Sequence, residues 1–313
     1  MNNNKLARPS EPDATGPAQD AGQDTIAGAS ALERRRGAWL AILAVVFFAT
    51  SPVLVRLADP LSPYEKTAGR LAVAAIALLL LMRVRRESFR LTRRDLPLFV
   101  GIGLIAALHF VAYVASLNFT TIAHSLAIVY TAPIFVALFS AWFLHEPIRP
   151  RQWLGVLVAV LGVAILAGFE PNWSARMAVG DLLALISAIM FGLYSVAGRR
   201  QRSNYPLFTY AVAVYALAAL WVLPAAAANL TPAGYTLGPL LAVLALGIIP
   251  LGIGHTLYNA AVRHTHATTA NLIATQEVTL GILLGALILG EAPKLNEMAG
   301  ALVTLIGIVL VLL

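Results

Sequence analysis

A long stretch of this chain occurs twice. Residues 130–168 read as an apolar helix with a proline, a glutamate at its exit, a short basic turn and a second apolar helix, and residues 275–313 repeat that order. The residues that coincide at a constant offset of 145 positions are Tyr113 and Tyr258, Ala115 and Ala260, Thr120 and Thr265, Glu146 and Glu291, Gly155 and Gly300, and Gly162 and Gly307. A match of this length makes the chain two copies of one structural unit.

Each copy is built from apolar runs long enough to cross a membrane. A hydrocarbon core of about 30 Å requires about 20 apolar residues of helix, and the chain is 59% hydrophobic and only 12% charged. The ten runs are 38–56, 63–82, 96–116, 122–144, 152–168, 180–198, 206–228, 237–261, 267–289 and 297–313. They lack the polar alternation of a membrane barrel. The sequence therefore predicts an all-α membrane protein with ten transmembrane helices.

Basic residues lie on alternate sides of the predicted spans. They gather in the N-terminal tail, in the loop over 83–94, in the turn over 149–151 and in the loop over 199–202. This asymmetry follows the positive-inside rule, so we expect both termini in the cytoplasm and a bacterial-type inner membrane as the location. The net charge of +7 then reflects topology, which argues against a nucleic-acid partner.

The number of spans in each copy determines how the copies are related. Five is odd, so the second copy enters the membrane from the opposite face, and the two copies form an inverted repeat. We expect the five-helix units over 37–168 and 169–313. Residues 1–36 contain few bulky apolar side chains and are expected to form a disordered cytoplasmic tail. With short loops throughout, the protein is expected to act inside the bilayer.

Helix breakers predict bends in three of the spans. Pro52 lies in the first span, Pro133 in the fourth, and Gly247, Pro250, Gly252 and Gly254 crowd eight residues of the eighth. A proline in a span frees a backbone carbonyl, which is tolerated where protein or a water-filled cavity satisfies it. A simple packing kink is an equal alternative for Pro52 and Pro133, and a weaker one for the eighth span.

Two five-helix halves, each ending in helix, glutamate, short turn and glycine-bearing helix, resemble the EamA-type members of the drug/metabolite transporter superfamily. The residues that carry the resemblance are Arg70, Ala132, Pro133, Glu146, Gly155, Gly162, Glu277, Glu291, Gly300 and Gly307. The family often has Glu-Pro in the ninth span, where this chain has Glu277-Val278. We therefore expect the ninth span to be straighter than the fourth. The resemblance implies transport of amino acids, other small metabolites, drugs or sugar-linked solutes.

Glu277 is the most informative ionisable residue. It falls near the middle of the ninth span, where an ionisable group is costly and indicates a functional site. Burial favours the uncharged form of a carboxyl group, which suits proton coupling or pairing with a substrate ammonium. A structural hydrogen bond to a neighbouring helix is an equally open alternative.

Polar and aromatic side chains on helix faces complete a candidate mid-membrane cavity. Such groups can hydrogen-bond a zwitterion or stack on planar and cationic ligands. The repeat-related Tyr113 and Tyr258 are expected to face each other across the pseudo-twofold axis and to line this cavity, whereas hydrogen bonding between helices is favoured for each histidine alone. The candidate substrate-binding residues are Phe48, Ser51, His109, Tyr113, Tyr130, Phe191, Tyr194, His255, Tyr258, Asn259 and Glu277.

Three further features have structural or gating interpretations. Arg70 could attract anionic groups, but we expect it rather to extend outward or to pair with Glu65. Glu146 and Glu291 end their spans at opposite membrane faces and are interpreted as gate or turn-capping residues. The paired glycines, spaced seven residues apart, predict close helix packing, either within the chain or in a homodimer.

The motifs of enzymes are missing from the sequence. It has no cysteine, no nucleotide-binding glycine-rich loop and no metal-ligand cluster, so we expect neither a cofactor nor a metal. Energy must then come from a gradient. The sequence predicts a secondary active transporter of small metabolites such as amino acids, with alternating access, the proton as candidate coupling ion, and export suggested by the resemblance alone. An uncoupled facilitator, a multidrug exporter of the same fold, and a membrane enzyme or lipid flippase are the alternatives.

Overall fold

The structure is a computed structural model that describes residues 17–120, 122–146, 148–167, 174–289 and 295–312. These residues are helical, without a strand among them. They include eight helical segments that are long and apolar enough to cross a membrane, and two shorter apolar helices, Pro150–Ile165 and Met298–Leu310. The shorter pair corresponds to the fifth and tenth predicted spans.

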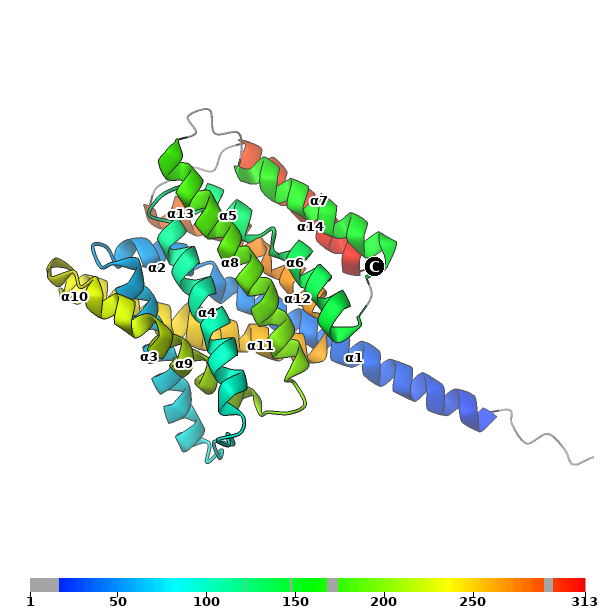
Figure 1. Cartoon of the computed structure of the whole chain (residues 1–313). Helices are drawn as coiled ribbons and strands as arrows, with labels where there is room; N and C mark the ends of the chain where they lie inside the picture. The colour runs from blue at the N-terminus through cyan, green and yellow to red at the C-terminus, as the bar shows by residue number, and fades with distance from the viewer. Residues whose placement is uncertain (1–16, 121, 147, 168–173, 290–294, 313) are drawn as a thin grey trace, which may run out of the picture.

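Several of the spans consist of two or more successive helices (Figure 1). In chain order the helices are α1 (Pro17–Phe48), α2 (Ser51–Leu57), α3 (Pro63–Val84), α4 (Leu96–Ser116), α5 (Ile122–Val129), α6 (Ala132–Phe139), the π-helix η1 (Ser140–Leu144), α7 (Pro150–Ala167), α8 (Ala175–Arg200), α9 (Leu207–Ala228), the 3₁₀ turn η2 (Pro232–Gly234), α10 (Leu237–Leu246), the π-helix η3 (Gly247–His255), α11 (Thr256–His264), α12 (Ala267–Ala274), α13 (Gln276–Leu289) and α14 (Leu295–Leu312).

The first helix differs from the expected disordered tail. α1 begins at Pro17 and continues to Phe48, so residues 17–36 are helical, and Figure 1 shows this end of α1 projecting from the bundle. A proline at the first helical position and repeated alanines both favour a helix there. Residues 1–16 lie outside the described part of the chain.

The helices pair in a way that joins the two halves of the chain. α3 packs against α9, α7 against α14, and α6 against α12. α4 packs against α8, just as α1 packs against η3 and α11. Suppose that each span of the first half is exchanged with its counterpart in the second, the first with the sixth, the second with the seventh and so on. The same set of pairs then results. The core therefore lies mainly between the halves.

Glycines bring α7 and α14 into close contact, and Figure 1 shows the two helices side by side. A Cβ atom added at Gly162 would lie 2.4 Å from the backbone nitrogen of Thr304, and one added at Gly307 would lie 2.4 Å from that of Ala159. Only glycine permits such an approach of two backbones. The close packing predicted for the glycine pairs is therefore found within the chain.

Three spans are interrupted beside a threonine that bonds back to its own helix. The threonine hydroxyls donate over 2.7 Å to carbonyls three residues earlier, Thr50 to Phe47, Thr131 to Ile128 and Thr275 to Leu272. Pro52 and Pro133 follow the first two breaks, as predicted. The third break, between α12 and α13, has no proline, so the ninth span is interrupted as well, and the expectation that it is straighter than the fourth stays a prediction. There the hydroxyl competes for a backbone carbonyl and disrupts the regular ladder.

The crowded breakers of the eighth span produce the π-helix η3, which contains Pro250. π-Helices are rare and often mark functional sites. A Cβ atom added at Gly247 would lie 2.5 Å from the Val73 side chain and 2.9 Å from the backbone oxygen of Arg70. The glycine thus allows η3 to lie directly against the part of α3 that carries Arg70.

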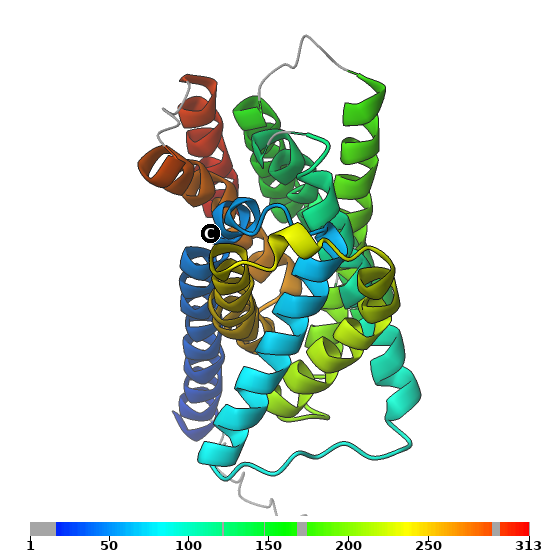
Figure 2. The same ribbon diagram turned by 90° about the vertical axis from the view of Figure 1, so that its left-hand side faces the viewer.

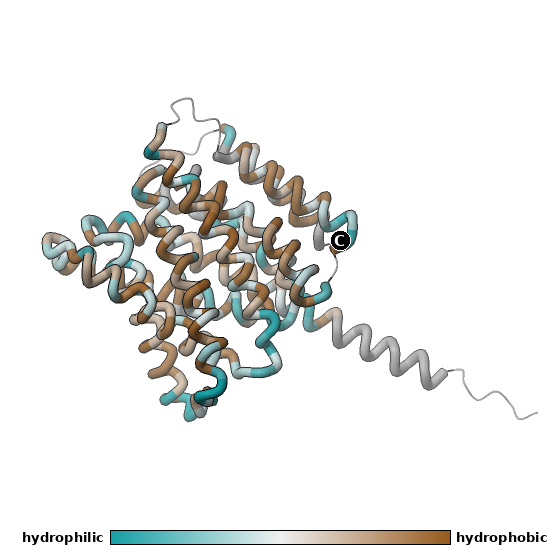
Figure 3. Tube along the Cα trace, in the orientation of Figure 1, coloured by the Kyte–Doolittle hydropathy of each residue, from teal (hydrophilic) through white to brown (hydrophobic). Residues whose placement is uncertain are grey.

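The surface is consistent with a protein embedded in lipid. Figure 3 shows apolar segments over the middle of the bundle and hydrophilic segments at its ends. Figure 2 shows the N-terminal part of α1 at the same end as the chain segment that follows α3. These segments carry two of the basic clusters counted from the sequence, which supports the predicted charge asymmetry.

Candidate functional site

A cavity lies between the two halves of the molecule. Its volume is about 30 Å³, so in this conformation there is room for a few water molecules. Its lining residues are Phe48, Ser51, Arg70, His109, Phe110, Tyr113, Leu126, Val129, Tyr130, Phe191, Pro250, His255 and Glu277. Because α1 to α5 supply one wall and α8, η3 and α13 the other, movement of one half against the other would change its size.

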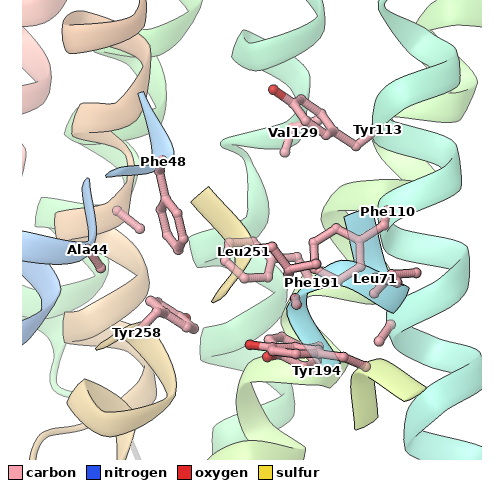
Figure 4. Close-up of a cluster of buried hydrophobic side chains, with 14 of the residues drawn as sticks. Ala44, Phe48, Leu71, Phe110, Tyr113, Val129, Phe191, Tyr194, Leu251 and Tyr258 are labelled. Carbon is pink, nitrogen blue, oxygen red and sulfur yellow. The ribbon is translucent and has the colours of Figure 1, made fainter. Parts of the chain in front are cut away.

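Most of the candidate residues from the sequence surround this cavity. Those that line it are Phe48, Ser51, His109, Tyr113, Tyr130, Phe191, His255 and Glu277. Tyr194, Tyr258 and Asn259 are buried but do not line it. Figure 4 shows Tyr113 and Tyr258 at different levels of the cluster, with Phe191 between them. Of the two tyrosines expected to line the cavity, Tyr113 therefore does so and Tyr258 does not.

The three candidates that do not line the cavity belong to a hydrogen-bond network beside it. The Asn259 amide donates to the hydroxyl of Tyr194 over 2.6 Å and to that of Tyr215 over 3.3 Å. The Tyr258 hydroxyl lies 2.8 Å from the Ser195 hydroxyl and accepts a bond from the Asn271 amide over 3.2 Å. These bonds join α8, α9, α11 and α12. The three residues therefore make hydrogen bonds between helices, which is the structural alternative to lining the cavity.

Two histidines and three phenylalanines form an aromatic wall. The ring of His109 stacks on Phe191, with 4.8 Å between centroids and 13° between planes, and its Nδ1 lies 2.9 Å from the Ser187 hydroxyl. His255 lies between Phe48, at 4.4 Å, and Phe110, at 4.9 Å. Phe110 was missed in the sequence, although it lies next to His109 and three residues before Tyr113 on the same helix. The wall offers flat faces suited to apolar or planar ligands.

Glu277 is held at the cavity by a residue from the other half. The Tyr130 hydroxyl donates a hydrogen bond to Oε2 of Glu277, and Glu277 is only 7% exposed. The break at Thr275 places Glu277 in the first turn of α13, where the helix dipole favours negative charge. Both alternatives considered for Glu277 therefore have a geometric basis, since it contacts the cavity and also joins two helices.

Arg70 occupies a different position from the one expected. It is 1% exposed and lines the cavity, with its guanidinium carbon 5.1 Å from the centroid of the Phe110 ring. Glu65, the expected partner, instead accepts hydrogen bonds from the Ser62 amide at 2.8 Å and the Tyr235 hydroxyl at 2.6 Å. The available signal was depth, since Arg70 lies two turns inside its span and an ionisable group there indicates function.

A cluster of charged residues joins three elements at the end of the molecule where the basic loop over 199–202 lies. Arg199 donates to Oε1 of Glu146 from Nε at 3.1 Å and from Nη2 at 3.0 Å, and Nδ1 of His266 lies 3.1 Å from Oε2. Burial opposes ionisation of Glu146, but the His266 hydrogen bond and the Arg199 charge hold the pKa of this carboxyl below its ordinary value. Glu291, the repeat counterpart of Glu146, lies outside the described residues.

Comparison with known proteins agrees with this architecture. The model of the EamA-like transporter family matches residues 35–168 and again residues 178–313. The chain is 29% identical over 278 residues to the pseudopaline exporter CntI of Pseudomonas aeruginosa (strain UCBPP-PA14), covering 87% of this chain and 94% of that protein. It is 24% identical over 281 residues to the aromatic amino acid exporter YddG of Ancylobacter novellus, covering 88% and 96%.

A solved crystal structure shares the fold, with a TM-score of 0.76 at 20% identity over 88% of this chain and 95% of the other. The two family matches together span most of the sequence, and each coincides with one of its repeated halves. The chain belongs to the EamA-like transporter family.

Proposed function

We propose that the protein is a secondary active transporter that exports a small metabolite of amino-acid character across a bacterial inner membrane. The observation that carries this proposal is the buried cavity between the halves, in which Arg70 and Glu277 share one aromatic-walled space. Its relatives CntI and YddG are named as exporters, one of pseudopaline and one of aromatic amino acids. The name of YddG supports a substrate that carries amino and carboxyl groups.

Alternating access is supported by how the halves pack. We interpret α7 and α14 as the fifth and tenth spans, which places both termini in the cytoplasm and makes the halves an inverted repeat. The pairs that join the halves are unchanged when the halves are exchanged. Two equivalent packings of similar energy are then expected, each opening the cavity to one side of the membrane.

The ion cluster at Glu146 indicates which side is closed. It links η1, α8 and α12 at the end that carries the basic 199–202 loop, which the positive-inside rule assigns to the cytoplasm. We therefore interpret the structure as closed toward the cytoplasm. Glu146 is then a gate residue, and Glu291 is its proposed counterpart at the other face.

Glu277 is the proposed coupling residue. A buried carboxylate can bind either a proton or a substrate ammonium, because both bind to the same negatively charged oxygens. Competition between the two for one site couples their movements in opposite directions. Tyr130 stabilises the empty, ionised site through its hydrogen bond.

Transport into proteoliposomes under an imposed pH gradient tests this proposal. We expect wild-type protein to accumulate a labelled amino acid against its gradient, and Glu277→Gln to lose the response to pH. Glu87→Gln is the matched control, because Glu87 pairs with Arg85 outside the cavity. Equilibration without accumulation in the wild type would instead identify an uncoupled facilitator.

A further inference from the structure

Arg70 is a buried cation without a matching anion in the described structure. Its Nε and Nη1 atoms are buried and have no hydrogen-bond partner among the described residues. No described carboxylate lies within ion-pair distance of its guanidinium. A charge at this depth is costly unless it is paired, so the position calls for a ligand that supplies the missing anion.

The carboxylates near Arg70 already have other partners. Asp59 pairs with Lys66, one turn before Arg70 on α3. Glu65 caps the start of α3 and accepts hydrogen bonds from the Thr231 amide and the Tyr235 hydroxyl, on either side of η2. Glu277 accepts from Tyr130, and it is near enough to Arg70 for their charges to interact without a direct ion pair. The guanidinium is thus left facing the cavity.

The surroundings of Arg70 restrict the kind of anion. The guanidinium carbon lies over the Phe110 ring, 5.1 Å from its centroid, and the unpartnered Nε and Nη1 remain to donate to a planar anion such as a carboxylate. Glu277 adds a negative charge to the same cavity, which disfavours a ligand with a net negative charge and favours one that also carries an ammonium group. The aromatic wall offers apolar contacts for a ligand side chain once movement of the halves enlarges the cavity.

We propose that Arg70 is the carboxylate-binding residue of the cavity, and that the cavity selects zwitterionic amino acids by holding the carboxylate at Arg70 and the ammonium at Glu277. This assignment rests on the proposed transport function. It gives Arg70 a specificity-determining role, in place of the outward or Glu65-paired role expected from the sequence.

Binding to purified protein in lipid nanodiscs, measured by calorimetry, tests the assignment on both partners. The probes are L-phenylalanine, phenethylamine, which lacks the carboxylate, and 3-phenylpropionate, which lacks the ammonium. For the wild type we expect phenylalanine to bind on the order of 10- to 100-fold more tightly than phenethylamine, as for the loss of a charged hydrogen-bonded pair. For Arg70→Gln the two ligands should bind alike.

Lys66→Gln is the matched control. Lys66 is also fully buried on α3, but it pairs with Asp59 and does not line the cavity. We expect this variant to keep the preference for phenylalanine over phenethylamine, and Arg70→Lys to keep part of it. Arg70→Gln should melt no lower than the wild type, because it removes an unpaired buried charge, whereas a structural Arg70 would make it melt lower.

The outcomes separate this assignment from the proposed function. A wild type that moves amines as readily as amino acids in proteoliposomes remains a transporter, but the Arg70 assignment fails. Preserved discrimination in Arg70→Gln also overturns it. If the wild type binds none of the three probes, both the amino-acid class and the Arg70 assignment are wrong. If Arg70→Gln fails to fold, the assignment is judged on the wild type alone. It then fails unless the wild type binds phenylalanine more tightly than both phenethylamine and 3-phenylpropionate.

Discussion

Tyr130 and Glu277 show how one hydrogen bond can serve both packing and function. Each side chain lies beside a threonine-marked helix break, Tyr130 just before Thr131 and Glu277 just after Thr275. The breaks bring both side chains to the cavity, where the hydroxyl of one satisfies the carboxylate of the other. The same bond therefore joins the fourth and ninth spans at the residue that we propose as the coupling site.

Removing that hydroxyl tests its contribution. Tyr130→Phe leaves a buried charged acceptor without its partner, which costs about 1–3 kcal/mol, so we expect a lower Tm and slower proton-coupled uptake. Tyr210→Phe is the matched control, because the Tyr210 hydroxyl is buried with no hydrogen-bond partner among the described residues and its loss should be nearly neutral. Thermal unfolding of both variants in nanodiscs is the measurement. Equal shifts in the two variants would refute the special role of Tyr130.

At the scale of elements, the pair α7 and α14 shows how glycine spacing determines helix packing. The two helices meet through Gly162 and Gly307, each pressed against the backbone of the other helix. Their outward faces carry exposed leucines, such as Leu157 and Leu302, which suits contact with lipid. Packing in a membrane depends on such close fits, because lipid tails provide no hydrophobic driving force between helices.

The same substitution at two glycines should have opposite effects. Gly162→Ala places a methyl group 2.4 Å from the Thr304 backbone nitrogen, and overpacking of this kind costs about 1–3 kcal/mol. Gly101→Ala in α4 meets no atom within 4 Å and should stabilise by up to about 1 kcal/mol through helix propensity. Thermal unfolding of the two variants checks the signs. A destabilised Gly101→Ala together with an unaffected Gly162→Ala would contradict this packing.

At the scale of the whole molecule, the repeat could be recognised from the sequence, because its polar landmarks recur at a constant offset. The depth and orientation of side chains could not. The π-helix η3 widens the turn just before Tyr258, so a helical face drawn with regular spacing does not carry both His255 and Tyr258 to the cavity. Thr275 breaks its span without proline. Arg70 lacks a paired carboxylate because Glu65 and Glu277 are bonded instead to residues far away in the sequence. Each of these results from tertiary contacts that spacing alone does not encode.

The proposed closure toward the cytoplasm concerns the whole molecule, and it can be tested through the ion cluster at Glu146. The chain has no cysteine, so Ser51→Cys supplies one thiol in the cavity lining for labelling by an impermeant reagent from the cytoplasmic side. Breaking the bonds between Glu146 and Arg199 removes contacts that join η1 to α8. We expect Glu146→Gln to raise the labelling rate at neutral pH.

The pH dependence of that labelling follows from the direction of the Glu146 pKa. Because His266 and Arg199 together outweigh burial and hold the pKa of Glu146 below its ordinary value, its ionised form stabilises the closed state. That contribution is fully present above the ordinary carboxyl pKa of about 4.3 and is lost as the pH falls through the lowered value. Labelling of the wild type should therefore stay slow at neutral pH and approach the Glu146→Gln rate only in more acidic solution. Glu87→Gln, which removes an exposed pair with Arg85, should label like the wild type at neutral pH. If Glu146→Gln and Glu87→Gln label alike there, the Glu146 cluster does not hold the cytoplasmic side closed.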